Sequence, residues 1–143
     1  MKTVFHIIVM VLICTSCLKN SNCGYYTNIN GKGAKISREY ALKDFDALRI
    51  YGGIDVHFEQ ADTFRVAFRA QENIFEHIDL RVEESTLVAC PDWEKVNCHF
   101  FLNVNHQGMD LTIYAPRLEE IVINGNGDFD IRSGYVSEDG LKL

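Results

Sequence analysis

A pattern of fourteen residues occurs twice in this chain, and the two copies lie 73 residues apart. Residues 45–58 (FDALRIYGGIDVHF) align without a gap to residues 118–131 (LEEIVINGNGDFDI). Each copy contains a strand, a glycine turn, an aspartate and a second strand. The spacing is too long for one supersecondary unit and fits about three stacked rungs of a β-solenoid. The alternative is that two ordinary β-hairpins converge on the same pattern. The coinciding turn residues are Gly52 with Gly125 and Asp55 with Asp128.

Strict alternation of apolar and polar residues indicates strands elsewhere in the chain. Residues 54–59 and 64–69 both alternate, which is typical of strands that bury one face. Only residues 72–78 show helical spacing, and they make barely two turns. The sequence therefore predicts an all-β domain. The other strands that we expect cover residues 80–83, 86–89, 109–115, 118–123 and 128–132.

The N-terminus has the parts of an export signal. Lys2 precedes a short apolar stretch, residues 4–13, and small residues then precede Cys17. This apolar stretch is too short to span a bilayer, which takes about 20 residues. Residues 14–17 (CTSC) resemble the bacterial lipobox, whose last cysteine receives a lipid before cleavage, although a cysteine stands where leucine is usual. We predict a lipoprotein signal peptide over residues 1–17 with lipidation at Cys17; an ordinary signal peptide cut nearby is the alternative.

The remainder divides into a tether and one β domain. Residues 18–38 are polar and turn-rich, which suggests a flexible tether, and residues 39–143 then form the domain. The net charge of −6 and the absence of a basic run argue against nucleic acid as a partner. The partners that we expect are a lipid anchor in a bacterial membrane and a surface polysaccharide or a protein. The sequence does not predict an oligomeric state.

Three cysteines remain after the signal: Cys23, Cys90 and Cys98. Cys90 and Cys98 flank a short loop, and an oxidising compartment would permit a disulfide between them. The sequence does not fix the Cα separation that a disulfide requires, so both the paired and the free state stay open. With His99 these cysteines could contribute to a zinc site, but a fourth ligand is not apparent.

Alternating polar side chains at residues 124–130 (NGNGDFD) invite a calcium interpretation, because hard cations prefer clustered oxygens. Phe129 stands where the EF-hand needs glycine and where the nonapeptide β-roll needs aspartate. Turn chemistry, in which asparagine and glycine adopt the turn and aspartate binds local amides, explains the pattern better. We predict no metal and no cofactor.

Four carboxylates could serve as acid and base of a polysaccharide-cleaving β-helix enzyme, a reaction that needs two carboxyl groups at a fixed separation in a cleft. Strand alternation instead puts them on a solvent-facing side. No nucleophile elbow, phosphate loop or dinucleotide fingerprint occurs. The sequence thus predicts no catalytic residues and no enzyme. The carboxylates concerned are Asp55, Glu59, Asp128 and Asp130.

Residues 123–129 (INGNGDF) resemble the recurring Gly-Ser-Gly-Asp turn of the auto-transporter adhesin head domain called the GIN domain, and residues 44–56 resemble its entry strand pair. That family consists largely of exported proteins and lipoproteins of Gram-negative bacteria. The resemblance implies a right-handed parallel β-solenoid, with some antiparallel hairpin pairing at its N-terminal end, and no established activity. In this chain the family turn motif corresponds to Gly52, Asp55, Gly125, Gly127 and Asp128.

The resemblance also suggests a short or truncated family member, since the family usually continues through further Gly-x-Gly-Asp rungs. The leading hypothesis is a non-enzymatic cell-envelope lipoprotein, expected at the outer membrane on either its periplasmic or its surface face. Its adhesin-like β-solenoid would serve adhesion or scaffolding. The alternatives are a carbohydrate-active β-helix enzyme, or a degenerate relative of one, and a truncated fragment without independent function.

Overall fold

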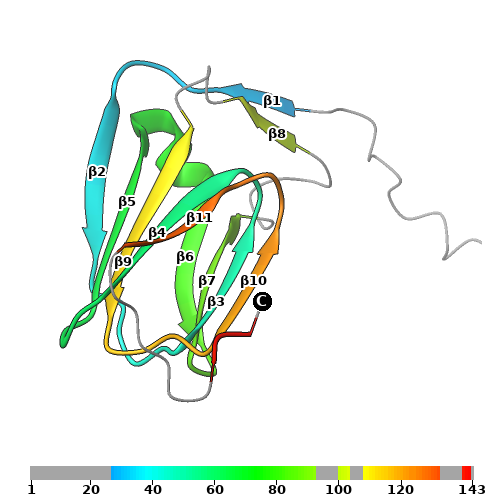
Figure 1. Ribbon diagram of the computed structural model, residues 1–143. Helices are drawn as coiled ribbons and strands as arrows, with labels where there is room; N and C mark the ends of the chain where they lie inside the picture. The colour runs from blue at the N-terminus through cyan, green and yellow to red at the C-terminus, as the bar shows by residue number, and fades with distance from the viewer. Residues whose placement is uncertain (1–26, 93–99, 104–107, 133–139, 143) are drawn as a thin grey trace, which may run out of the picture.

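The computed structural model describes residues 27–92, 100–103, 108–132 and 140–142 (Figure 1). Most of them form two β-sheets that face each other across the core. The four-stranded sheet has the order β10 (Glu120–Asn124), β3 (Ala47–Tyr51), β7 (Thr86–Pro91) and β6 (Ile78–Glu83). The five-stranded sheet has the order β11 (Phe129–Arg132), β4 (Ile54–Gln60), β9 (Met109–Ala115), β5 (Arg65–Gln71) and β2 (Lys35–Tyr40). Two short strands, β1 (Thr27–Asn30) and β8 (Phe100–Asn103), pair with each other.

The repeat in the sequence is also a repeat in the structure. The first copy supplies β3 and β4, the second supplies β10 and β11, and each copy crosses from one sheet to the other at its glycine turn. β10 pairs in parallel with β3, and β11 pairs in parallel with β4. Every paired residue lies beside its own equivalent, as Ile121 does beside Leu48 and Phe129 beside Val56. The interpretation of the pattern as a true structural repeat is therefore confirmed.

Antiparallel pairs complete both sheets. β7 and β9 extend the parallel pairing by one strand in each sheet, and β6 then pairs antiparallel with β7, as β5 does with β9. The two sheets are mixed and do not close on each other. The all-β prediction is thus confirmed, whereas a continuous parallel solenoid is not established by these strands.

Alternation along the strands determines the core. Ile54, Val56 and Phe58 of β4 are fully buried, and Leu48 and Ile50 of β3 face them from the other sheet. Burial of one such side chain contributes about 1.5–3 kcal/mol to the free energy of unfolding. The stretch with helical spacing forms a short 3-10 helix, η2 (Glu72–His77), whose Ile74 and Phe75 enter the same core.

The expected tether is wrong for residues 27–38, because β1 and the start of β2 lie there. All six residues of β2 pair with β5. β2 is an edge strand with mostly exposed side chains, so main-chain hydrogen bonds hold it and no apolar pattern marks it. The rest of the predicted tether, residues 18–26, and the predicted signal peptide lie outside the described residues.

Candidate functional site

The two glycine turns of the repeat lie directly on each other. The Gly52 amide donates to the carbonyl of Asn124 over 3.0 Å, and the Val56 amide donates to the carbonyl of Asp128 over 2.8 Å. Hydrogen bonding between the two copies therefore continues from one sheet, through the turn, into the other. Gly52 itself has a φ of +94°, a left-handed conformation that favours glycine.

The glycines of the second turn are required by close approach of the main chain. A Cβ atom on Gly125 would lie 2.1 Å from the carbonyl oxygen of Gly52. A Cβ atom on Gly127 would lie 1.9 Å from the carbonyl oxygen of Ile54. Both distances are far below van der Waals contact, and the clashing atoms belong to the main chain of the other copy. The Gly-x-Gly pattern is therefore a requirement of turn stacking.

The two aspartates of the motif meet on the outer face of the five-stranded sheet. Asp55 Oδ1 accepts a hydrogen bond from the amide of Asp128 over 3.0 Å. On its other side Asp55 lies beside Asp110 of β9, whose Oδ2 accepts from Lys35 Nζ over 2.6 Å. Asp55 thus holds the next turn in place. The contact joins the Asp55 carboxylate to the main chain of Asp128.

The remaining candidate carboxylates follow the same two strands. Asp130 lies beside His57, with 3.7 Å between Asp130 Oδ2 and His57 Nδ1, and Glu59 lies beside Arg132. All of these side chains are on the face opposite the core. Within the described ranges no group of three or more histidine, cysteine, aspartate or glutamate residues could hold a metal ion.

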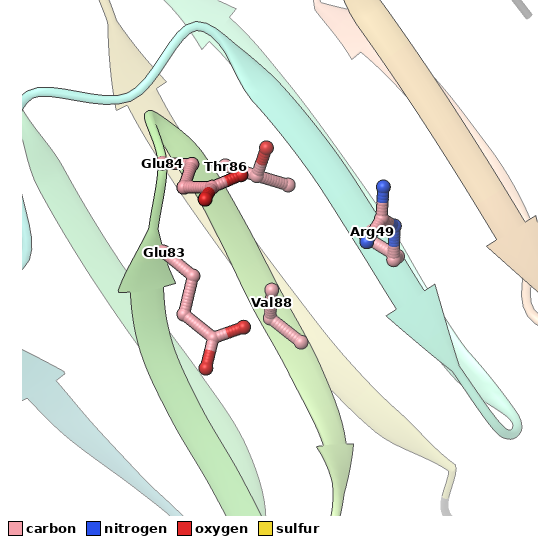
Figure 2. A pocket seen from close by; sticks show the side chains of 5 residues that line it. All are labelled: Arg49, Glu83, Glu84, Thr86 and Val88. Carbon is pink, nitrogen blue, oxygen red and sulfur yellow. The ribbon is translucent and has the colours of Figure 1, made fainter.

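The outer face of the four-stranded sheet carries a hollow of about 490 Å³ (Figure 2). β3 contributes one side chain, β7 contributes two, and the end of β6 with the following turn contributes two more. We call it the Arg49 hollow. Sequence reasoning missed it, because its walls come together only through pairing of β3 with β7. Among the described residues, those that line it are Arg49, Glu83, Glu84, Thr86 and Val88.

The turn beside the Arg49 hollow has an unusual main-chain conformation. Glu84 and Ser85 connect β6 to β7, with φ values of +46° and +62°. Two-residue hairpin turns with two positive φ values favour Asn-Gly, and left-handed residues other than glycine cost about 1 kcal/mol or more each. The Ser85 carbonyl accepts hydrogen bonds from the amides of Asp46 and Ala47, which ties the turn to the start of β3.

Comparison with known proteins identifies the family. Residues 44–141 match the family model described as "Putative auto-transporter adhesin, head GIN domain". The chain belongs to this family. The match covers both copies of the repeat and both turns.

Solved structures with the same fold are longer than this GIN-family chain. A "putative lipid binding protein" from Parabacteroides distasonis is 27% identical with a TM-score of 0.66, over 73% of this chain and 44% of that one. A "putative adhesin" from Bacteroides fragilis is 25% identical with a TM-score of 0.61, over 74% of this chain and 47% of that one. A second "putative adhesin", from Parabacteroides merdae, is 18% identical with a TM-score of 0.61, over 73% of this chain and 41% of that one. At this identity it shows the fold alone. The chain thus spans less than half the length of these structures. No curated protein matches it.

The predicted cysteine sites of this GIN-family chain are only partly described. Cys90 is buried on β7, and Arg81 Nη1 donates to its Sγ over 3.2 Å. Hydrogen bonds to Glu83, Cys90 and Asp79 raise the pKa of Arg81. Cys98, the predicted disulfide partner, and Cys17, the predicted lipidation site, lie outside the described residues, so both assignments stay predictions. No helix in the described ranges is long and apolar enough to cross a membrane.

Proposed function

We propose that this GIN-family chain is a non-enzymatic cell-envelope protein whose β domain binds a partner through its flat outer faces, for adhesion or scaffolding. The observation that carries the proposal is the position of Asp55 and Asp128. On an outer face of the sheet the Asp55 carboxylate accepts from the Asp128 amide, so it serves the stacking of the two turns, which supports a binding role over acid–base catalysis.

Two ion pairs fix charged side chains at the surface of the described domain, one between β2 and β9 and one between the segments that precede β3 and β10. Lys35 and Asp110 are 2.6 Å apart with side chains only 13% and 25% exposed. Arg117 Nη2 lies 2.8 Å from Asp46 Oδ2. Ordered polar side chains on a rigid sheet favour contact with a hydroxyl-rich or charged surface, because few rotamers are lost on binding. The partner class that we propose is a surface polysaccharide or a protein, consistent with the adhesin description of the family.

The finer architecture is part of the proposal. We propose that the stacked copies are rungs of a right-handed parallel β-solenoid, with the antiparallel strands at its N-terminal end. Three parallel strands in each sheet and the exact 73-residue register support this arrangement. A stacked sheet of this kind offers a long contact surface without a catalytic pocket.

The proposed anchor is a lipid on Cys17 that holds the mature chain in the outer membrane. Several acyl chains anchor a protein stably, whereas one chain does so only marginally. Mass spectrometry of the mature N-terminus after membrane fractionation tests the lipid anchor, with Cys17→Ser as the matched control. We expect a lipid-modified Cys17 in the membrane fraction and loss of membrane association in the variant. An unmodified N-terminus in a soluble fraction would contradict the anchor.

The binding function is tested with polysaccharides from bacterial surfaces. We expect the chain to co-sediment with at least one insoluble polysaccharide, or to retain one protein partner after cross-linking, without release of new reducing ends. Release of reducing ends that disappears in Asp55→Asn would instead favour a carbohydrate-active enzyme. Complete insolubility of the chain from which residues 1–17 are removed would favour a fragment without independent function.

A further inference from the structure

Both sheets end at the second copy of the repeat, and the core is less well covered there. β10 and β11 are the last strands at this edge of their sheets (Figure 1). Three inward-facing residues of the second copy are only partly buried, although their equivalents in the first copy are fully buried. The pairs are Ile123 with Ile50, Phe129 with Val56 and Ile131 with Phe58. The change in burial at equivalent positions indicates an edge that a further strand can cover.

The main chain of β11 has free hydrogen-bonding groups along this edge. The Val56 amide of β4 donates to the Asp128 carbonyl, which therefore points toward β4. Main-chain groups of successive residues in a strand point to alternate sides, so those of Phe129 and Ile131 point away from β4. Among the residues that the structure describes, β11 pairs with β4 alone. An unpaired edge of this kind is a template for another strand.

The neighbouring edge of β10 already accepts a piece of main chain. Lys142 lies beside Glu120 in a parallel bridge, and its carbonyl accepts from the Ile121 amide over 2.9 Å. Within the described ranges this contact covers only the start of β10, whereas β11 is uncovered over all four of its residues. β11 is therefore the edge with room for a whole strand.

The charges of β11 favour a second copy of the same strand as its partner. Asp130 and Arg132 are both exposed on the outer face, with 3.9 Å between Asp130 Oδ2 and Arg132 Nε. In an antiparallel pair centred on Ile131, Asp130 of each copy lies opposite Arg132 of the other, and opposite charges across two strands stabilise the pair. This register also keeps Phe129 and Ile131 facing the core. A pair centred on Asp130 would instead place two like charges opposite each other.

We propose that two copies of this chain form a two-fold symmetric dimer in which the β11 strands pair antiparallel with Ile131 at the centre. The two five-stranded sheets then continue into each other. Ile131 exchanges hydrogen bonds with its own equivalent through the main-chain groups that point away from β4. The inference goes beyond the proposed function, because it concerns the open edge of the sheet and not its outer faces. In the dimer each outer face is presented twice, which raises the avidity for a repetitive surface.

Sedimentation velocity of the Cys17→Ser chain under reducing conditions tests the dimer, because this variant removes the proposed anchor and leaves the β domain unchanged. We expect a reversible dimer within chain concentrations up to about 0.5 mM. Ile131→Pro should be a folded monomer, because the lost amide points away from β4 and proline is tolerated at such edge positions. Ile131→Val keeps the amide and is the matched control, which should still dimerise. Circular dichroism verifies that each variant is folded.

An exchange of two charges tests the register and leaves the main chain unchanged. We expect Asp130→Arg to weaken the dimer by about tenfold or more, because its new positive charge faces Arg132 of the second copy at two symmetric positions. The double variant Asp130→Arg with Arg132→Asp places opposite charges across the pair again, so it should recover the affinity that the single variant loses.

Three results would overturn the proposal. They are a monomer at every concentration, a dimer that persists in folded Ile131→Pro, and a double variant that dimerises no better than Asp130→Arg. Polysaccharide or protein binding by a chain that stays monomeric would remove the dimer alone and leave the proposed function standing.

Discussion

Replacement of Gly127 by alanine tests whether turn stacking holds the two copies of the repeat together. The added Cβ atom would lie 1.9 Å from the carbonyl oxygen of Ile54 and 2.6 Å from its carbonyl carbon. Ordinary contact begins at 3.4 Å, so the second turn must move away by more than 1 Å. No side-chain rotation can relieve this clash, because the Cβ position is fixed by the main chain of residue 127 and the atoms that it meets belong to the main chain of Ile54, which is fully buried.

The magnitude follows from the contacts that this movement disturbs. Overpacking of an ordered site costs about 1–3 kcal/mol. Displacement of the turn also weakens the hydrogen bonds from Gly52 to Asn124 and from Val56 to Asp128, each with a net contribution of about 1 kcal/mol. We expect the free energy of unfolding to fall by about 2–4 kcal/mol in Gly127→Ala.

Urea denaturation monitored by circular dichroism measures this loss, and Gly53→Ala is the control. A Cβ atom on Gly53 meets nothing within 4 Å, and Gly53 does not adopt a left-handed conformation. We expect Gly53→Ala to change the free energy of unfolding by less than about 1 kcal/mol. An increase is the expected direction, because alanine restricts the unfolded chain more than glycine does. Equal stability of the Gly53 and Gly127 variants would refute the argument that close main-chain approach selects glycine in this turn.

Three further predictions concern single side chains. Asp55→Ala should lower the free energy of unfolding by about 1 kcal/mol, because the Asp128 amide loses its acceptor, whereas Asp55→Asn keeps an acceptor oxygen and should fold nearly as stably; equal losses in chemical denaturation would contradict this role. Phe58→Ala should cost about 3–5 kcal/mol in the same assay, because Phe58 is fully buried between the sheets, and a loss below 1 kcal/mol would show that the core is not packed as described. Burial raises the pKa of Tyr40, so the unfolded chain loses this proton first and stability should decline as pH rises through about 10 and above; Tyr40→Phe should flatten that decline, and identical alkaline profiles would exclude the effect.

The elements that the sequence predicted are those in which side chains carry the signal. Alternation located β4 and β9 to within a residue, since one face of each is buried. The gapless repeat aligned the residues that pair between β10 and β3, but the 73-residue spacing suggested about three stacked rungs, whereas the two copies pair with each other directly. β2 was missed because main-chain pairing holds it at an edge, and its side chains carry no period.

The candidate sites divide in the same way. The Gly-x-Gly-Asp motif was visible because turn stacking fixes residue types at fixed spacing, as the close approach at Gly127 shows. The Arg49 hollow was not visible, because Arg49 and Glu84 are ordinary exposed side chains until β3 and β7 pair. Nothing in their local sequence distinguishes them from other charged residues on a strand and in a turn.

The use of glycine separates the two kinds of turn in this molecule. Gly125 and Gly127 occupy positions where any side chain would strike the main chain of the other copy, so fold alone accounts for them. Glu84 and Ser85 occupy left-handed positions where glycine or asparagine would be more stable, yet the chain places a charged and a hydroxyl side chain there. Fold stability therefore explains the residues of the stacked turns and fails to explain Glu84.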